Sequence, residues 1–188
     1  MTQCINKLVK DLAFDCDDTV KGIELSLLLV NREDIDLGAT QVEGNHIKTF
    51  VLKSGKTAYK VDYAKESHIS VSTKPEFSDD DFNGHKHSIV LKIYGKDKED
   101  YDQIDKLVSG ASLVAIVQNK GKNLENTFDV YGYYIGLEAT EGEGRINGGV
   151  YTLTLSTPSK QKEPKTALRW LQTDYATTKG KFDNKLSA

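Results

Sequence analysis

The stretch Ile23-Glu-Leu-Ser-Leu-Leu-Leu-Val-Asn31 decides the fold class of this chain. It begins with alternating apolar and polar residues and ends in the continuous apolar run Leu27–Val30. Alternation is typical of a strand with one buried face, whereas an uninterrupted apolar run is typical of a strand buried on both faces. A second apolar run, Leu113-Val-Ala-Ile-Val117, has the same character. The sequence therefore predicts a mainly β domain.

Alternating segments predict further strands along most of the chain. These strands are expected at His46–Lys53, Tyr59–Tyr63, Ile69–Thr73, Ser88–Tyr94, Phe128–Leu137 and Val150–Ser156. The dipeptide Ser54-Gly55 predicts a turn that joins the first two of them as a hairpin. Polar loops are expected at Asn31–Gly44, Pro75–Gly84 and Glu141–Gly149.

One internal helix is predicted over Glu99–Val108. Asp97 is a suitable N-cap, and Gly110 can end the helix. Its apolar stripe consists of Tyr101, Ile104, Leu107 and Val108.

A second, shorter helix or arm is predicted at the N-terminal end of the sequence. Its apolar residues follow helical spacing at i, i+3, i+4 and i+7. They are Ile5, Leu8, Val9 and Leu12.

The length of 188 residues suits one domain with extensions. We expect an N-terminal arm at residues 1–21, a β-rich domain of the sandwich or barrel type at 22–157, and a C-terminal extension at 158–188. After Pro158 the composition shifts to Lys, Thr, Gln and Ala with almost no strand pattern. Leu168, Trp170 and Leu171 would be costly to leave in water, so they either contact a partner or pack back on their own domain.

Composition excludes several classes of function. The net charge of −3 argues against a surface that grips nucleic-acid phosphates. No apolar run approaches the roughly 18–20 residues of a membrane helix, and the acids within residues 1–20 do not fit a signal peptide, so we expect synthesis in the cytoplasm. Cys4 and Cys16 lack metal or redox spacing and are expected to be reduced thiols, although a bridge between them stays open.

The motifs that could carry chemistry are weak. Ser54-Gly-Lys-Thr57 resembles the end of a phosphate-binding loop but lacks its first glycine and joins two predicted strands. His85 and His87 could both offer imidazole to a metal, yet no third ligand is specified by spacing. We therefore predict no catalytic, cofactor or metal site, and a protein that is not an enzyme.

The order of the predicted elements resembles that of the tail tube (major tail) proteins of bacteriophages, a family related to the tubes of injection systems. The resemblance extends over roughly Ile23–Ser156. It depends on the helix Glu99–Val108 and the strand Leu113–Val117, followed by Phe128-Asp-Val-Tyr-Gly-Tyr-Tyr-Ile-Gly-Leu and Gly149-Val-Tyr-Thr-Leu-Thr-Leu-Ser.

This resemblance implies a virion protein whose copies form a ring, commonly a hexamer, with inner strands that line a channel for DNA. Its partners would be further copies of itself and other tail proteins. The loops at 31–44 and 75–84 and both flanking segments would then stack the rings. The expected assembly contacts are Ile5, Leu8, Val9, Leu12, Leu168, Trp170 and Leu171.

Two alternatives stay open from the sequence. One is an adaptor, neck or decoration protein of a phage particle. The other is a β-sandwich module that binds a glycan or a host protein through Tyr131, Tyr133 and Tyr134.

Overall fold

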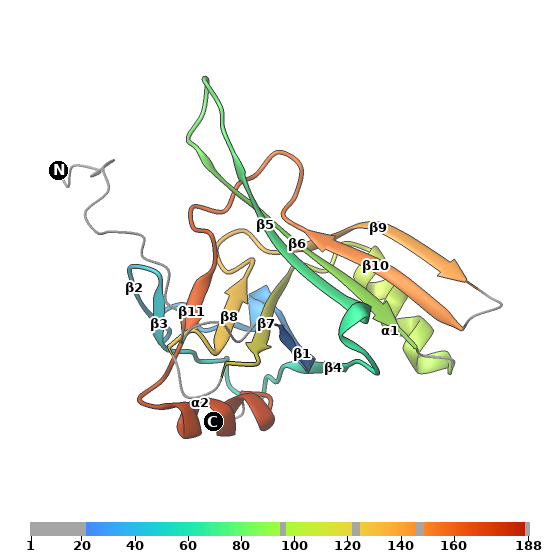
Figure 1. Ribbon diagram of the computed structural model, residues 1–188, viewed down its shortest axis with the longest axis horizontal. Helices are drawn as coiled ribbons and strands as arrows, with labels where there is room; N and C mark the ends of the chain where they lie inside the picture. Colours follow the sequence, from blue (N-terminus) through green and yellow to red (C-terminus); the bar gives the residue numbers. More distant parts are fainter. Residues whose placement is uncertain (1–21, 95–96, 122–124, 146–148, 187–188) are drawn as a thin grey trace.

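The computed structural model describes residues 22–94, 97–121, 125–145 and 149–186. It is mainly β, as the sequence predicts. The described elements form three layers (Figure 1). A seven-stranded sheet is the middle layer, helix α2 lies beneath it, and a four-stranded sheet lies above it. The predicted N-terminal arm, with Ile5, Leu8, Val9 and Leu12, lies outside the described residues.

The seven-stranded sheet has the order β2-β3-β11-β8-β7-β1-β4. All its pairings are antiparallel except the one between β11 and β3. Its strands are β1 (Ile23–Asn31), β2 (Gln41–Glu43), β3 (His46–Thr49), β4 (Tyr59–Asp62), β7 (Leu113–Asn119), β8 (Phe128–Tyr131) and β11 (Leu168–Trp170).

The four-stranded sheet has the order β5-β6-β10-β9 and is antiparallel throughout. Its strands are β5 (Ile69–Glu76), β6 (Gly84–Ile93), β9 (Glu138–Arg145) and β10 (Val150–Ser156). The helices are α1 (Lys98–Val108) and α2 (Tyr175–Asp183), with single 3-10 turns η1 (Arg32–Asp34) and η2 (Glu66–His68).

Strands β1 and β7 separate two apolar cores. Leu27 and Leu29 of β1 pack in the core between the two sheets, whereas Leu28 and Val30 pack in the core beneath the seven-stranded sheet. Strand β7 divides its apolar residues in the same way. The prediction of strands buried on both faces is confirmed at both positions, because each run supplies side chains to two cores.

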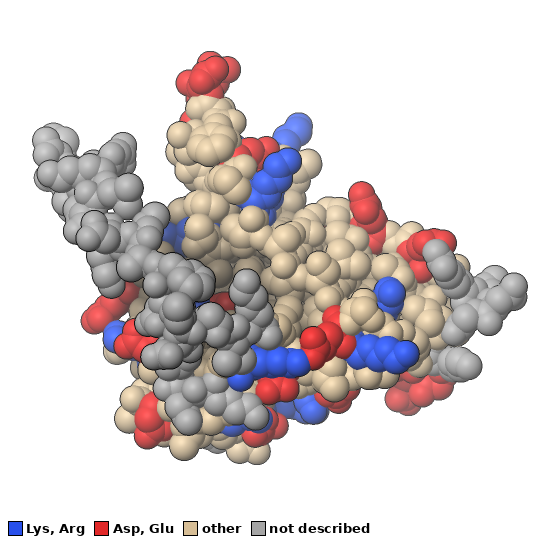
Figure 2. Space-filling view, in the orientation of Figure 1, with Lys and Arg blue, Asp and Glu red and all other residues tan. Residues whose placement is uncertain are grey.

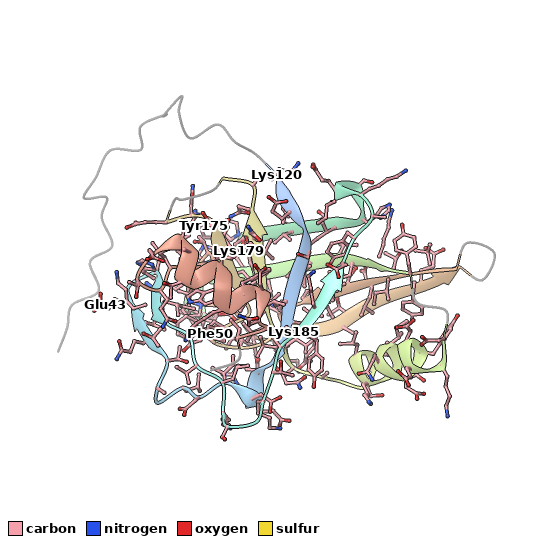
Figure 3. The ribbon with its side chains drawn as sticks, turned by 90° about the horizontal axis from the view of Figure 1, so that it is seen from below. Glu43, Phe50, Lys120, Tyr175, Lys179 and Lys185 are labelled. Atoms are coloured by element: carbon pink, nitrogen blue, oxygen red, sulfur yellow. The ribbon has the colours of Figure 1, made fainter. Side chains whose placement is uncertain are left out.

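The lower core is closed by the C-terminal part of the chain. Trp170 of β11 is fully buried between Phe50 and Phe128, and Phe182 of α2 packs on Phe128. Viewed from below (Figure 3), α2 lies across the seven-stranded sheet. Asp174 caps this helix by accepting a hydrogen bond from the Thr177 N–H at 2.7 Å.

The predicted internal helix is confirmed as α1. The Asp97 carboxylate accepts a hydrogen bond from the Asp100 N–H at 2.8 Å, as expected of an N-cap. Ile104 is buried and Leu107 half-buried, but Tyr101 and Val108 are each 53% exposed. The helix therefore covers the end of the upper core with only part of its apolar stripe.

The predicted hairpin between His46–Lys53 and Tyr59–Tyr63 is wrong. Strand β3 pairs with β2 through a turn at Gly44, where φ is 60°, and β4 lies at the opposite edge of the sheet beside β1. The turn chemistry that sets the register is thus at Gly44-Asn45 rather than at Ser54-Gly55, because φ > 0 suits glycine.

Two further boundaries differ from the prediction. Strand β8 ends at Tyr131 because Gly132 and Gly136 turn the chain at φ of 74° and 98°. The segment Glu138–Arg145, expected to be largely a loop, is strand β9. Gly142 and Gly144 lie opposite Leu153 and Tyr151 in the register, and the Tyr151 ring covers both glycines.

The residues after Pro158 are not an appendage to the core. They include β11, which lies inside the seven-stranded sheet, and α2, which closes the lower core. Leu168 and Trp170 are 1% and 0% exposed. They therefore pack on their own domain, which is one of the two alternatives that the sequence left open.

This position predicts the effect of truncation. A chain that ends at Pro158 lacks Leu168, Trp170, Phe182 and Leu186, so we expect it to lose cooperative unfolding rather than remain a folded subunit. Phe182→Ala alone should lower the free energy of unfolding by about 3–5 kcal/mol, measured by urea denaturation. The control Ala176→Gln, at an exposed position of α2, should cost less than about 0.5 kcal/mol. A cooperative thermal transition in the truncated chain would contradict this account.

Candidate assembly surfaces of the four-stranded sheet

The four-stranded sheet has one apolar face and one polar face. Ile89, Leu91, Leu153 and Leu155 point into the upper core. Alternation places the intervening residues on the outer face, away from the seven-stranded sheet. Cross-strand rows on that face are Ser72, Ser88, Ser156 and Glu138; Ser70, Val90, Thr154 and Glu141; Lys92, Thr152 and Glu143; and, in the hairpin, Lys74 and Lys86.

Small hydroxyl side chains dominate these rows. Ser70 and Ser72 are exposed, and Ser88, Thr154 and Ser156 are half-buried. The hydroxyls bond along the surface, as between Thr140 Oγ1 and Ser156 Oγ at 2.9 Å. The result is a polar face on which small hydroxyl side chains alternate with Glu and Lys side chains.

Both edges of this sheet are unpaired among the described residues. The edges are β5 and β9, each eight residues long. Pro75 lies opposite His85 in the β5–β6 ladder and has no N–H to donate. Its position is therefore one at which the N–H of any other residue would point away from β6. By alternation, Ile69, Val71 and Thr73 also direct their N–H groups to the open edge. The main chain of β5 can therefore accept another strand.

The β5–β6 hairpin projects from the molecule. Its register continues to Glu76 and Gly84, beyond Ser88, where the pairing of β6 with β10 ends. Acidic side chains cap the tip of this projection (Figure 2), and Asp79, Asp80 and Asp81 occupy it. Phe77 beside them is 78% exposed.

Two lysines attach the segment 157–163 to this hairpin. Lys86 Nζ donates to the carbonyl oxygens of Pro158 and Ser159 at 2.6 and 2.9 Å. Lys162 Nζ donates to the Phe82 carbonyl oxygen at 3.0 Å and lies 5.6 Å from the Phe82 ring centroid. These bonds brace the projecting arm on one side.

Glu163 fastens the base of the arm to the turn after β8. It is 1% exposed, and its carboxylate accepts hydrogen bonds from the N–H groups of Ile135 and Tyr134 at 2.8 and 3.2 Å. Its main chain forms a bridge with His85. Burial raises the pKa of Glu163, while the bonds from the backbone N–H groups oppose that rise.

His87 makes a second link at the same place. The Gly132 N–H donates to His87 Nδ1 at 3.0 Å, so Nε2 carries the proton and donates to the Lys165 carbonyl oxygen, also at 3.0 Å. The neutral ring satisfies both contacts. Burial lowers the pKa of His87 to about 4.

The predicted assembly contacts fall in three places. Leu168 and Trp170 are in the core and cannot contact a partner while the chain is folded, which corrects their assignment as assembly contacts. Leu171 is half-buried, and its N–H donates to the Ile47 carbonyl oxygen. The N-terminal four, Ile5, Leu8, Val9 and Leu12, lie outside the described residues.

The structure also places the residues of the weak motifs. Lys56 of Ser54-Gly-Lys-Thr57 forms a 2.9 Å ion pair with Asp34, in a loop between two strands. Tyr133 is buried and Tyr131 and Tyr134 are half-buried, which leaves no open aromatic platform. Among the described residues, no group of three or more His, Cys, Asp or Glu could hold a metal ion, and no helix could span a membrane.

Sequence reasoning did not single out Phe77, Phe82 or strand β9. The signal for the two phenylalanines is their position on either side of the acidic triplet, where an apolar residue is unexpected in a polar loop. For β9 the alternation of Glu and Gly carried no strand propensity.

Comparison of the chain with protein-family models, with curated proteins and with solved structures finds no match.

The His87 link predicts a pH dependence of stability. Between pH 6.5 and about 4 the unfolded chain takes up a proton on this imidazole that the folded chain does not, so stability falls as the pH falls. The loss should approach about 3 kcal/mol at pH 4. Urea denaturation at pH 7, 6, 5 and 4 measures it.

The control is His87→Gln, which lacks the titrating ring but retains Glu163. Because Glu163 titrates in both proteins, the difference between the two pH profiles isolates His87. The variant should be less stable at pH 7 and lose less stability on acidification. Parallel profiles would contradict the assignment.

Proposed function

We propose that this chain is a non-catalytic structural protein of a bacteriophage particle, whose copies form rings that stack into a tail tube through which DNA passes. The observation that carries the proposal is the four-stranded sheet, with its unpaired edges β5 and β9 and its polar outer face. The resemblance in element order is a second, independent support.

The strand directions of this sheet suit a closed ring. Across β5, β6, β10 and β9 every pairing is antiparallel, so β9 runs opposite to β5. When copies are related by rotation, β9 of one copy meets β5 of the next in the antiparallel sense. Such a head-to-tail contact pairs both edges and closes when the rotation allows.

The outer face suits a channel that does not retain DNA. A polyanion would meet hydroxyl groups and the carboxylates of Glu138, Glu141 and Glu143, with Lys92 and the exposed Lys74 as counter-charges. Lys86, which lies in β6 like Lys92, donates hydrogen bonds to main-chain carbonyl oxygens. Affinity for DNA depends on lysine and arginine contacts to phosphates, so this composition favours passage over binding.

The projecting hairpin is the element suited to stack one ring on the next. It extends beyond the sheet, is braced by the segment 157–163, and presents Phe77 to solvent. Phe82 on the same tip is 53% exposed, and exposed apolar side chains that gather at one place are typical of a contact with another molecule. In this proposal the partners are further copies, in rings that are commonly hexameric, and other tail proteins of the virion.

Edge pairing can be tested with Val71→Pro. The Val71 N–H points away from β6, so proline removes a donor needed by a neighbouring copy without removing a bond within the sheet. We expect the variant to stay folded and monomeric, whereas the wild-type chain forms rings or tubes. Negative-stain microscopy and light scattering measure the difference.

The matched control is Val71→Ala, which loses the same half-buried side chain but keeps the N–H. It should assemble like the wild type. Circular dichroism establishes that both variants are folded. Tubes formed by Val71→Pro, or a wild-type chain that stays monomeric at high concentration, would count against the proposal.

Stacking can be tested separately with Phe77→Ser. Because Phe77 is 78% exposed, its replacement should leave the melting temperature unchanged. Rings should still form, but tubes should shorten several-fold in electron micrographs. The control Leu25→Ser replaces a side chain that is 43% exposed on β1 and should leave tube length unaltered. Tubes of wild-type length in Phe77→Ser would exclude the hairpin tip as the stacking element.

A further inference from the structure

A groove of about 670 Å³ opens at one end of the upper core, between α1 and the edge strand β4. Its apolar lining includes Leu29, Val61, Ile93, Ile104 and Leu107. Val61, Ile93 and Leu107 are only half-buried, so the two sheets and α1 do not close the core here. The volume is within the range of pockets that bind sizeable ligands.

Aromatic side chains form the rim of this groove. Tyr59 of β4 is 52% exposed and Tyr94 is 45% exposed, and both line it. On α1, Tyr101 and Val108 are also more than half exposed. Exposed apolar side chains gathered beside a groove are typical of a docking surface.

The chain contains a segment with matching chemistry. Ile5, Leu8, Val9 and Leu12 form an apolar stripe at helical spacing. An amphipathic helix that lays such a stripe in an apolar groove is a common mode of recognition. The stripe needs only residues 5–12, and all of them lie outside the described residues.

Charge favours the same pairing. The segment 4–12 carries Lys7 and Lys10 against the single acid Asp11. Helix α1 beside the groove has the opposite balance: Glu99, Asp100, Asp102 and Asp105 exceed Lys98 and Lys106. The Lys60 ammonium on the other wall is already paired with Asp62 at 2.9 Å. Opposite net charges steer the two surfaces together.

The length of the connection is sufficient. The described chain begins at Gly22, whose carbonyl oxygen accepts a bond from the Lys120 N–H at 3.0 Å. From Gly22, β1 runs to Leu29 and Asn31 at the groove, a distance of about 23–30 Å at 3.3 Å per residue. Residues 13–21 can span about 30 Å when extended.

We propose that residues 4–12 of this chain form an amphipathic helix whose stripe of Ile5, Leu8, Val9 and Leu12 occupies the groove between α1 and β4. The docked segment closes the upper core, covers the Tyr59 and Tyr94 rings and shields the open edge of β4. This contact does not require ring or tube assembly, because the segment can reach the groove of its own chain.

Crosslinking in the full-length chain tests the contact. Cys4 lies beside the stripe, so Cys16→Ser leaves it as the single thiol, and Gln103→Cys adds a second thiol at the groove. The control pairs Cys16→Ser with Lys160→Cys, at an exposed turn beside the hairpin base. Treatment with a short bismaleimide should crosslink Cys4 to position 103 at least tenfold faster than to position 160.

Adding Leu8→Asp to the Gln103→Cys chain should abolish that difference, because it places a charge in the apolar stripe. Gel mobility and mass spectrometry distinguish a link within one chain from a link between two copies; either one supports the segment as occupant. Equal crosslinking rates at positions 103 and 160, or a fast reaction that survives Leu8→Asp, would overturn the proposal. Neither result depends on whether tubes form, so this test and that of the proposed function fail independently.

Discussion

Burial of the β1–β7 pair on both faces is the constraint on which the rest of the structure depends. A strand such as Leu27–Val30 with apolar side chains on each side must be covered twice, once by another sheet and once by a further layer. The four-stranded sheet covers one face through Ile89, Leu91, Leu153 and Leu155. The other face is covered by α2 together with Trp170 and Phe50. The order of the three layers follows from this requirement.

The same arrangement determines which surfaces remain open. The four-stranded sheet is the outermost layer on its side, so its second face meets solvent and carries Ser, Thr and charged residues. Its edges are unpaired among the described residues, and its longest hairpin continues past the layer below. Because the polar links at Glu163 and His87 are buried and satisfied, this hairpin is held at its base rather than free to swing. A rigid projection and an open sheet are the features that the proposed assembly uses.

The groove beside α1 follows from the limits of the upper core. Helix α1 is attached through one buried residue, Ile104, with Leu107 half-covered, and its polar side is acidic. A cover of this size does not fill the end of a sandwich whose edge strand β4 has only four residues. A further segment of suitable length and polarity would complete it.

Strong local signals were sufficient for part of the structure. The β class, the strands at Leu27–Val30 and Leu113–Val117 and the α1 helix with its Asp97 cap were predictable, because periodicity and capping depend on neighbouring residues. The sheet to which each strand belongs was not predictable: β3 and β4 are close in sequence yet lie far apart in the seven-stranded sheet. Likewise, the sequence left open whether Leu168 and Trp170 contact a partner or their own domain, and it predicted a loop from Glu141 onward where β9 continues to Arg145. Their states are set by long-range pairing with β3, β8 and β10 and by packing on Phe128 and Tyr151, and that pairing depends on the tertiary structure rather than on local propensity.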